Sequence, residues 1–316
     1  MNLKLKKILY LPYPRGFCAG VDRAINIVEL SLEKYGPPIY VRHEIVHNPW
    51  VIKDLESKGV IFIENLKDAP EGSRVIFSAH GIPISVQNEA ENREMPFIDA
   101  TCPLVKKVHN EAKRLHKDGA HVFLIGHEGH PEVIGTMGQI PKDAITLIQR
   151  KEDIQKINNK NFDRVALITQ TTLSVDDTKE IIEELKGIFP KIIQPPKEDI
   201  CYATTNRQHA IKSIANYCDL LYVIGADNSS NSLRLVEVGK KSGCNKTHLI
   251  SDVSEVDWEE IEKQQKIGLT AGASAPDILI QEFIDKMNNL YDVEIINISV
   301  ADENITFKIP KELNER

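Results

Sequence analysis

Apolar residues recur at helical spacing in three stretches of the chain, and each stretch begins shortly after a cysteine. The stretches span residues 21–28, 104–115 and 210–218, and they follow Cys18, Cys102 and Cys201 in turn. A spacing of i, i+3, i+4 and i+7 places such side chains on one face of a helix. The sequence therefore predicts three amphipathic helices, each with a cysteine near its N-terminal end.

Short apolar runs between these helices predict strands, and these strands end in turns of polar or small residues. The turns span residues 47–49, 130–132 and 228–232, and later in each repeat 78–81, 169–172 and 271–274. A helix-like segment follows every turn. Strands that alternate with helices predict parallel sheets covered by helices. Ligands of such sheets bind outside the carboxyl ends of the strands, where these six turns are expected.

The same order of elements occurs three times, with the three cysteines 84 and 99 residues apart. We therefore predict an α/β fold of three repeated α/β modules, with small, mostly parallel sheets around a pseudo-threefold axis. The predicted modules are 1–101, 102–198 and 199–286, with a linker at Pro195-Pro196 and a C-terminal tail at 287–316 that closes the structure. Generic βα units resemble one another, which explains the strands but not one cysteine at the same place in each unit.

The composition is that of a globular protein, with 41% hydrophobic and 27% charged residues among 316. The formal net charge of −7 argues against non-specific binding to nucleic acids or membrane surfaces, which needs an excess of basic residues. The apolar run at 8–11 is too short for a signal peptide, and no apolar stretch has the length that crosses a bilayer. We therefore expect a cytoplasmic protein with no membrane or nucleic-acid partner.

In a cytoplasmic protein, cysteines bind metals or take part in catalysis more often than they form disulfides. None of the five cysteines forms a CxxC pair, so the zinc-finger and zinc-ribbon signatures are absent from the sequence. Three thiolates at helix starts can hold zinc, and an all-sulfur site also suits an iron–sulfur cluster. A [4Fe–4S] cluster takes four ligands, so one cluster per chain at the centre of the modules would keep one iron open. Cys218 continues an apolar helix face and is interpreted as a buried structural thiol; Cys244 has no assigned role.

Three of the ten histidines, His47, His80 and His130, stand at the special turns. Together with the Ser, Thr and Asn residues at helix starts, they are suited to bind an oxyanion or a phosphate. Each turn alone is a weak signal, because Ser and Asn are ordinary helix caps. Glu132 would be a proton donor in an enclosed pocket, and a helix-start carboxylate if it is exposed. The segment 127–132 lacks the HExxH spacing, so we reject a zinc protease.

At these turns the sequence resembles the 4-hydroxy-3-methylbut-2-enyl diphosphate reductases. The matching segments near the first two cysteines are PRGFCAGVDRA (14–24), YVRHEIVHN (40–48), FSAHG (77–81) and DATCPLV (99–105). Further matches are GHPEV (129–133), TQTTLS (169–174), ICYATTNRQ (200–208), NSSNS (228–232), TAGASAPD (270–277) and ENITF (303–307). The resemblance thus runs from the first strand to the tail.

The resemblance implies the last step of the non-mevalonate isoprenoid pathway, in which an allylic hydroxyl is removed reductively to give isopentenyl and dimethylallyl diphosphates. It implies that Cys18, Cys102 and Cys201 ligate the cluster and that Thr171 and Glu132 relay protons. The implied contacts to the diphosphate are His47, His80, His130, Ser229, Ser230, Asn231 and Ser274. Electrons would come singly from a ferredoxin or a flavodoxin. A monomer is compatible with these features.

Two other classes of protein share part of this pattern. A lyase similar to quinolinate synthase also has three modules, three cysteine ligands and an open iron, but its net dehydration needs no reductant. An iron–sulfur sensor would not need six polar turns around its cluster. The need for a reductant tests the lyase, and binding of diphosphate anions tests the sensor.

Overall fold

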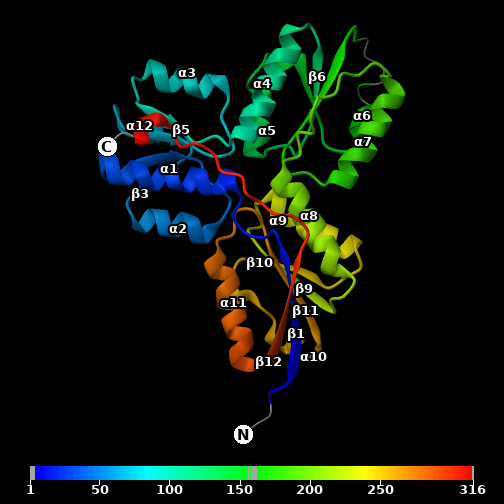
Figure 1. Cartoon of the computed structure of the whole chain (residues 1–316). Helices are drawn as coiled ribbons and strands as arrows, with labels where there is room; N and C mark the ends of the chain where they lie inside the picture. The colour runs from blue at the N-terminus through cyan, green and yellow to red at the C-terminus, as the bar shows by residue number, and fades with distance from the viewer. Residues whose placement is uncertain (1–3, 156, 158–161, 315–316) are drawn as a thin grey trace. The chain divides into compact units, whose positions relative to one another are not determined.

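The computed structural model describes residues 4–155, 157 and 162–314. Within these ranges the chain alternates strands and helices and forms two compact units. Unit 1 consists of Met1–Ala19, His47–Val51 and Tyr202–Ile305, and unit 2 of Gly20–Val46, Ile52–Cys201 and Thr306–Arg316. Each unit is therefore assembled from separate stretches of the sequence, and Figure 1 shows the elements by colour along the chain.

Unit 1 contains a five-stranded parallel sheet in the order β10-β9-β11-β1-β12. The strands are β1 (Lys6–Tyr13), β9 (Leu220–Ile224), β10 (Thr247–Ile250), β11 (Lys266–Ala271) and β12 (Asp292–Ser299). The N-terminal strand β1 lies between β11 and β12, so strands from both ends of the chain complete this sheet. The central strands β9 and β11 are buried almost throughout, as expected for a parallel sheet covered on both faces.

Unit 2 contains two smaller parallel sheets, in the orders β3-β2-β4-β5 and β7-β6-β8. Their strands are β2 (Ile39–Arg42), β3 (Val60–Ile63), β4 (Val75–Phe77), β5 (Phe97–Asp99), β6 (His121–Ile125), β7 (Ile145–Ile148) and β8 (Val165–Thr169). In all three sheets the first strand of the repeat is flanked by the second on one side and by the third on the other. The prediction of three small parallel sheets is confirmed.

The helices follow the predicted order. They are α1 (Ala19–Tyr35), α2 (Pro49–Ser57), α3 (Ile84–Asn92), α4 (Pro103–Lys117), α5 (Pro131–Met137), α6 (Lys151–Gln155), α7 (Val175–Ile188), α8 (Tyr202–Ala215), α9 (Ser230–Lys241), α10 (Trp258–Lys263), α11 (Asp277–Leu290) and α12 (Lys311–Asn314). Helices α1, α4 and α8 begin directly after Cys18, Cys102 and Cys201, as the apolar spacing predicts. Their apolar faces pack into the buried cores; α4, for example, buries Val108, Ala112 and Leu115 against β6 and β8.

One strand is absent from the sequence-based prediction. The three-residue strand β5 pairs with β4 and leads directly into the Cys102 turn. Ile193, in the segment that leads towards Cys201, forms an isolated parallel bridge with Ala166 of β8. Strand β1 holds the corresponding place before Cys18, beside β11. Each cysteine is thus preceded by a segment that adds to the edge of the third strand of a repeat.

Candidate functional site

The three repeat cysteines are anchored by the same backbone hydrogen bond. In unit 1, the amide of Cys18 donates to the carbonyl of Ala273 at 3.1 Å. In unit 2, the amide of Cys102 donates to the carbonyl of Ala79 at 2.9 Å, and that of Cys201 to the carbonyl of Thr171 at 3.0 Å. Each acceptor lies in the small-residue turn that ends a third strand. The repeat seen in the sequence therefore extends to the geometry that holds each cysteine.

The thiols fall into two groups. None of the five cysteines forms a disulfide; Cys18, Cys102 and Cys201 are half-buried, whereas Cys218 and Cys244 are buried. Burial raises the pKa of the Cys218 thiol to about 12 and also raises the pKa of Cys244. These two thiols therefore stay protonated inside the core of unit 1, as inert structural cysteines do. The interpretation of Cys218 as a buried structural thiol is confirmed.

Unit 1 gathers the polar turns that follow β9 and β11. Ser229 caps α9 by accepting a hydrogen bond from the amide of Ser232 at 3.3 Å. Asn231 Oδ1 accepts from the amide of Ala273 at 2.9 Å, which joins the turn after β9 to the turn that holds Cys18. The side chains of Ser229, Ser230 and Asn231 are buried. Three predicted substrate-binding residues therefore share one N-terminal helix end.

Two further predicted residues meet in the same unit. Ser274 Oγ donates to the backbone carbonyl of His47 at 2.8 Å. Ser274 directly follows Ala273, which accepts from the Cys18 amide. The contacts therefore link Cys18, His47, Ser274 and Asn231 through consecutive residues of one turn. Polar side chains and helix N-terminal amides converge there, as in phosphate-binding sites of α/β proteins.

A buried arginine supports the loop before Cys18. The Arg207 guanidinium, with no exposed surface, donates to the carbonyl of Gly16 at 3.0 and 2.7 Å and to that of Phe17 at 3.2 Å. It also donates to Ala203 O at 2.9 Å and forms an ion pair with Glu303 at 3.0 Å. Gly16 has a φ of +70°, and a Cβ there would lie 3.2 Å from the Ala275 carbonyl, so this tight loop favours glycine.

Unit 2 encloses Glu132. This side chain is 3% exposed; Oε1 accepts from the amide of Thr171 at 2.7 Å, and Oε2 accepts from its hydroxyl at 3.0 Å. Burial raises the pKa of Glu132 to about 7, against the lowering effect of the two Thr171 hydrogen bonds, and the charge of Asp199 raises it further. The carboxyl is therefore enclosed rather than at the surface, and it can hold a proton near neutral pH.

Two of the predicted binding residues of unit 2, His80 and His130, lie close together, and His130 contacts the backbone of Glu132. His130 caps α5, and its Nδ1 accepts from the amide of Glu132 at 3.1 Å. The rings of His80 and His130 meet edge to face, with centroids 5.9 Å apart. Gly81 follows His80 with a φ of +79°, and a Cβ there would lie 2.6 Å from Cε1 of His109 on α4. The close approach of α4 therefore requires glycine in the turn that carries His80.

A continuous series of contacts thus crosses unit 2 from one repeat cysteine to another. It runs from Cys102 through Ala79, the His80 and His130 rings, Glu132 and Thr171 to Cys201. The predicted residues of unit 2 therefore lie together, as do those of unit 1.

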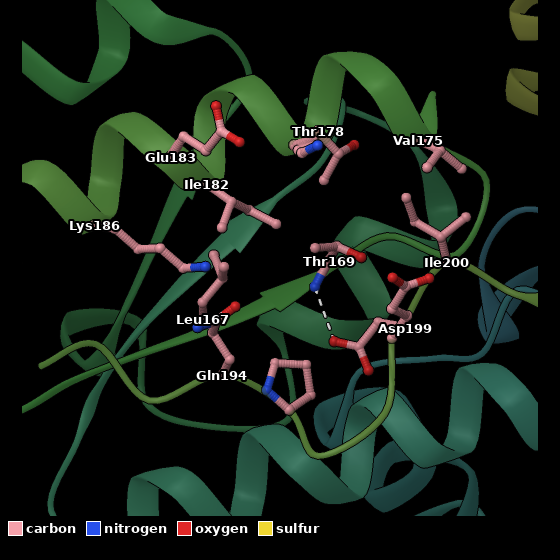
Figure 2. A pocket seen from close by; sticks show the side chains of 13 residues that line it. Leu167, Thr169, Val175, Thr178, Ile182, Glu183, Lys186, Gln194, Asp199 and Ile200 are labelled. Carbon is pink, nitrogen blue, oxygen red and sulfur yellow. Dashed lines mark hydrogen bonds between the residues drawn. The ribbon is translucent and has the colours of Figure 1, made fainter. Parts of the chain in front are cut away.

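A cavity of unit 2 lies apart from these residues. Figure 2 shows a cavity of about 300 Å³ between α7 and the segment before Cys201, with Asp199 hydrogen-bonded to the amide of Thr169 at 3.1 Å. Its walls include Leu167, Ile182, Lys186 and Gln194. None of the predicted substrate-binding residues lines this cavity, so we do not assign the substrate to it. Burial raises the pKa of Asp199 although the ammonium group of Lys107, at 3.1 Å, lowers it.

Cys18, Cys102 and Cys201 are the residues that could hold an iron–sulfur group. In the part of the chain that the structure describes, no three His, Cys, Asp or Glu side chains form a preassembled metal-binding group. The three half-buried cysteines are nevertheless held by equivalent backbone hydrogen bonds. Two of them, Cys102 and Cys201, lie at the two ends of the contacts that include Glu132. An all-thiolate set of this kind suits a soft iron–sulfur cluster.

Three features of the site were absent from the sequence-based prediction: Arg207, Glu303 and Asp199. Arg207 and Glu303 both lie in segments that match the family motifs, at 200–208 and 303–307, so the motifs contained the signal. Their pairing spans 96 residues of sequence, and no local pattern predicts it. Asp199 lies two residues before Cys201. Its burial, which the sequence does not predict, is what distinguishes it from an ordinary surface carboxylate.

Comparison with known proteins agrees with this arrangement. Residues 9–288 match the family model described as LytB protein. The chain belongs to the LytB protein family. The resemblance that the motifs indicated is thereby confirmed.

Two curated relatives are similar to this LytB family member over nearly the whole length of both chains. A protein of Ruegeria sp. (strain TM1040), named 4-hydroxy-3-methylbut-2-enyl diphosphate reductase, is 53% identical over 99% of each chain. A protein of the same name from Paracoccus denitrificans is 53% identical over 100% of each chain. The solved structure of the E-1-hydroxy-2-methyl-but-2-enyl-4-diphosphate reductase from Plasmodium falciparum is 39% identical. It has a TM-score of 0.91 and covers 99% of this chain and 97% of that chain.

A second solved structure is less close. It is described as (E)-4-hydroxy-3-methyl-but-2-enyl diphosphate reductase, the terminal enzyme of the non-mevalonate pathway. It is 31% identical with a TM-score of 0.65, over 90% of this chain and 99% of that chain. The mixed α/β fold with three parallel sheets is therefore that of these reductases.

Proposed function

We propose that this chain reduces 4-hydroxy-3-methylbut-2-enyl diphosphate to isopentenyl and dimethylallyl diphosphates, the last step of the non-mevalonate pathway. The observation that carries the proposal is the similarity, over 99–100% of each chain, to relatives with this activity in their names. The chain is then an oxidoreductase. In the reaction the allylic C–O bond breaks, two electrons and two protons are taken up, and the hydroxyl leaves as water.

Cys18, Cys102 and Cys201 would hold one [4Fe–4S] cluster in this proposal. Bound by three thiolates, such a cluster supplies single electrons and one iron with an open coordination position. The shared backbone anchor of the three cysteines supports this assignment. The buried thiols Cys218 and Cys244 take no part.

The polar turns would bind the diphosphate. Ser229, Ser230 and Asn231 begin α9, where backbone amides and the helix dipole favour an anion. Ser274, which follows the acceptor of the Cys18 amide, donates to the backbone carbonyl of His47. His80 and His130 would complete the set from unit 2. Binding at the diphosphate would orient the allylic alcohol at the other end of the substrate.

Glu132 would supply a proton, with Thr171 as its relay partner. Hydroxide is a poor leaving group, so the C–O bond breaks readily only if the oxygen is protonated. A carboxyl with a pKa of about 7 can carry that proton at neutral pH. The Thr171 hydroxyl, at 3.0 Å from Glu132 Oε2, can pass a proton on but does not supply one by itself.

The remaining partners are also proposals. Electrons would arrive from a ferredoxin or a flavodoxin, and we place the reaction in the cytoplasm. No helix in the described ranges is both long and apolar enough to cross a membrane.

The test is product formation from 4-hydroxy-3-methylbut-2-enyl diphosphate by anaerobically prepared protein, with and without a chemical reductant. We expect isopentenyl and dimethylallyl diphosphates only when the reductant is present. Turnover without a reductant would favour the lyase. Diphosphate binding without turnover under any reducing condition would favour the sensor.

A further inference from the structure

Helix α4 carries an excess of positive charge in an acidic protein. It contains five cations, Lys106, Lys107, Lys113, Arg114 and Lys117, and one anion, Glu111. The whole chain has a formal charge of −7. The exposed side of the helix is formed by Lys106, Asn110, Lys113, Arg114 and Lys117, which we call the α4 basic face. Helix α4 is labelled in Figure 1 and belongs entirely to unit 2.

The N-terminal end of this face is hollowed. A surface pocket of about 570 Å³ there is lined by Arg23, Thr101, Pro103, Lys106, Lys107, Asn110, Glu111 and Arg114. Thr101 and Pro103 are the two neighbours of Cys102. Arg23 donates to the carbonyls of Ala100 and Thr101, each at 3.2 Å. The pocket therefore borders the chain segment that carries a proposed cluster ligand.

A second cation of the pocket contacts the segment that precedes Cys201, the other cysteine of unit 2. Lys107 Nζ donates to the carbonyls of Lys197 at 3.1 Å and Glu198 at 2.9 Å, and it pairs with Asp199. These three residues lead directly into Cys201. The pocket thus borders the chain segments next to both Cys102 and Cys201.

Part of the positive charge is already paired, and part is not. Lys106 pairs with Asp99 at 2.7 Å, and Arg114 pairs with Glu111 at 2.6 Å and Asp118 at 3.2 Å. Exposed pairs of this kind contribute little and can be exchanged for the carboxylates of a partner. Among the residues that the structure describes, neither Lys113 nor Lys117 forms an ion pair or a side-chain hydrogen bond.

We propose that the α4 basic face and its pocket form the docking surface for an acidic electron-donor protein, which delivers electrons beside Cys102 and Cys201. The inference rests on the proposed function, because only a reductase needs such a donor. An acidic partner is repelled by the chain's net charge of −7 everywhere except at a basic patch, so electrostatics steers it to this face. Electron transfer weakens steeply with distance, and the pocket at the N-terminal end of this face borders the segments next to two of the three proposed ligands.

The test variant is Asn110→Glu with Lys113→Glu, which lowers the formal charge of the face from +4 to +1 without touching the proposed site. Both positions are exposed within α4, and glutamate favours a helix there by pairing with Lys106, Arg114 and Lys117 at i±4. The matched control is Lys286→Glu with Asn289→Glu on α11, which changes the same residue types at the same spacing on an exposed helix of unit 1.

Steady-state turnover is measured with two reductants, an acidic [2Fe–2S] ferredoxin and dithionite-reduced methyl viologen. With ferredoxin at low ionic strength we expect the α4 variant to lose about tenfold or more in kcat/KM for the donor, and to lose most of the salt dependence of wild type. With methyl viologen it should keep wild-type turnover, and the α11 control should behave as wild type with both reductants.

Unchanged ferredoxin kinetics in the α4 variant would overturn the docking surface. An equal loss of ferredoxin-dependent turnover in the α4 variant and the α11 control would overturn it too. The same holds if the α4 variant loses turnover with both reductants while the milder Lys113→Gln variant has normal ferredoxin kinetics. Binding of duplex DNA that the α4 variant alone loses, with ferredoxin kinetics unchanged, would reassign the face to nucleic acid and overturn the proposal. Wild-type protein that is inactive with methyl viologen as well would contradict the proposed function instead.

Discussion

At the scale of single residues, the carboxyl of Glu132 is the most informative group. It is enclosed in unit 2, both of its oxygens face Thr171, and its pKa is raised to about 7. A solvent-exposed carboxylate at a helix start would be neither enclosed nor raised in pKa. The choice between a proton donor and a helix-start carboxylate, which the sequence left open, therefore favours the donor.

Glu132→Gln should abolish most turnover while substrate binding persists. Glutamine preserves the shape and a hydrogen-bonding amide but carries no acidic proton, and general acid catalysis contributes on the order of 10²–10⁴-fold. The measurement is turnover with a chemical reductant beside a binding isotherm for the diphosphate. Near-normal turnover in the glutamine variant would remove Glu132 from the mechanism.

The activity of the wild type should also depend on pH through this group. If protonated Glu132 is the donor, turnover is highest below its pKa of about 7 and falls by up to about tenfold per unit above it. The profile of kcat/KM against pH, with a chemical reductant, checks this. A profile without a decline between pH 6 and 9 would contradict the assignment.

Stability should show the same ionisation. Between the ordinary value of 4.5 and about 7, the folded chain binds a proton at Glu132 that the unfolded chain has lost. The free energy of unfolding therefore decreases with rising pH by about 1.4 kcal/mol per unit in this window. Glu132→Gln should lack that decrease, so urea unfolding at pH 5 and pH 7 should show the variant gaining on the wild type. Parallel changes in both proteins would mean that the carboxyl is charged when buried.

The three proposed cluster ligands and the two buried thiols should respond differently to substitution. Cys18→Ser, Cys102→Ser and Cys201→Ser should each prevent cluster assembly, whereas Cys218→Ser and Cys244→Ser should not, because the last two are buried away from the shared backbone anchor. Iron and sulfide content after anaerobic reconstitution is the measurement. Full content in any of the first three variants would contradict the ligand assignment.

At the scale of elements, the turns between strands and helices position the site. The turn after β11 is the clearest case, because its consecutive residues contact Cys18, Asn231 and His47. We expect Ser274→Ala and His47→Ala to weaken diphosphate binding while leaving the iron content unchanged. Titration of the anaerobic protein with the diphosphate measures this. Unchanged affinity in both variants would argue against a binding role for this turn.

The loop before Cys18 is supported by a pair of residues, Arg207 and Glu303, that lie far apart in sequence. Glu303→Gln leaves the Arg207 cation buried with one charged partner fewer, and removal of one partner from a buried pair costs about 3–5 kcal/mol. Glu111→Gln, which breaks an exposed pair with Arg114, should cost less than about 1 kcal/mol. Urea unfolding compares the two. Equal small losses would mean that the Arg207 network is not structural.

Much at this scale followed from the sequence. The helices after Cys18, Cys102 and Cys201 could be predicted because their apolar faces repeat at helical spacing. Strand β5 could not, since three residues after a proline carry no periodicity. The Arg207–Glu303 pair could not either, because it depends on tertiary contact across 96 residues. Local patterns therefore predict elements and turns, and long-range pairing decides which buried polar groups are satisfied.

At the scale of the whole molecule, the predicted site residues fall into two compact units. Unit 1 carries Cys18 with the serine and asparagine turns, and unit 2 carries Cys102 and Cys201 at the two ends of the Glu132 contacts. The sequence predicted three parallel sheets, and all three exist with the same strand order. The predicted boundaries of the modules remain predictions.

The central claim is that three cysteines hold one cluster that responds to a diphosphate substrate. The most direct test is the visible and EPR spectrum of anaerobically purified protein, with its iron and sulfide content, before and after addition of 4-hydroxy-3-methylbut-2-enyl diphosphate. We predict about four iron and four sulfide per chain, as in a [4Fe–4S] cluster, and an EPR signal of the reduced protein that the substrate changes. A zinc-loaded protein without sulfide, or a cluster whose spectrum ignores the substrate, would contradict the account.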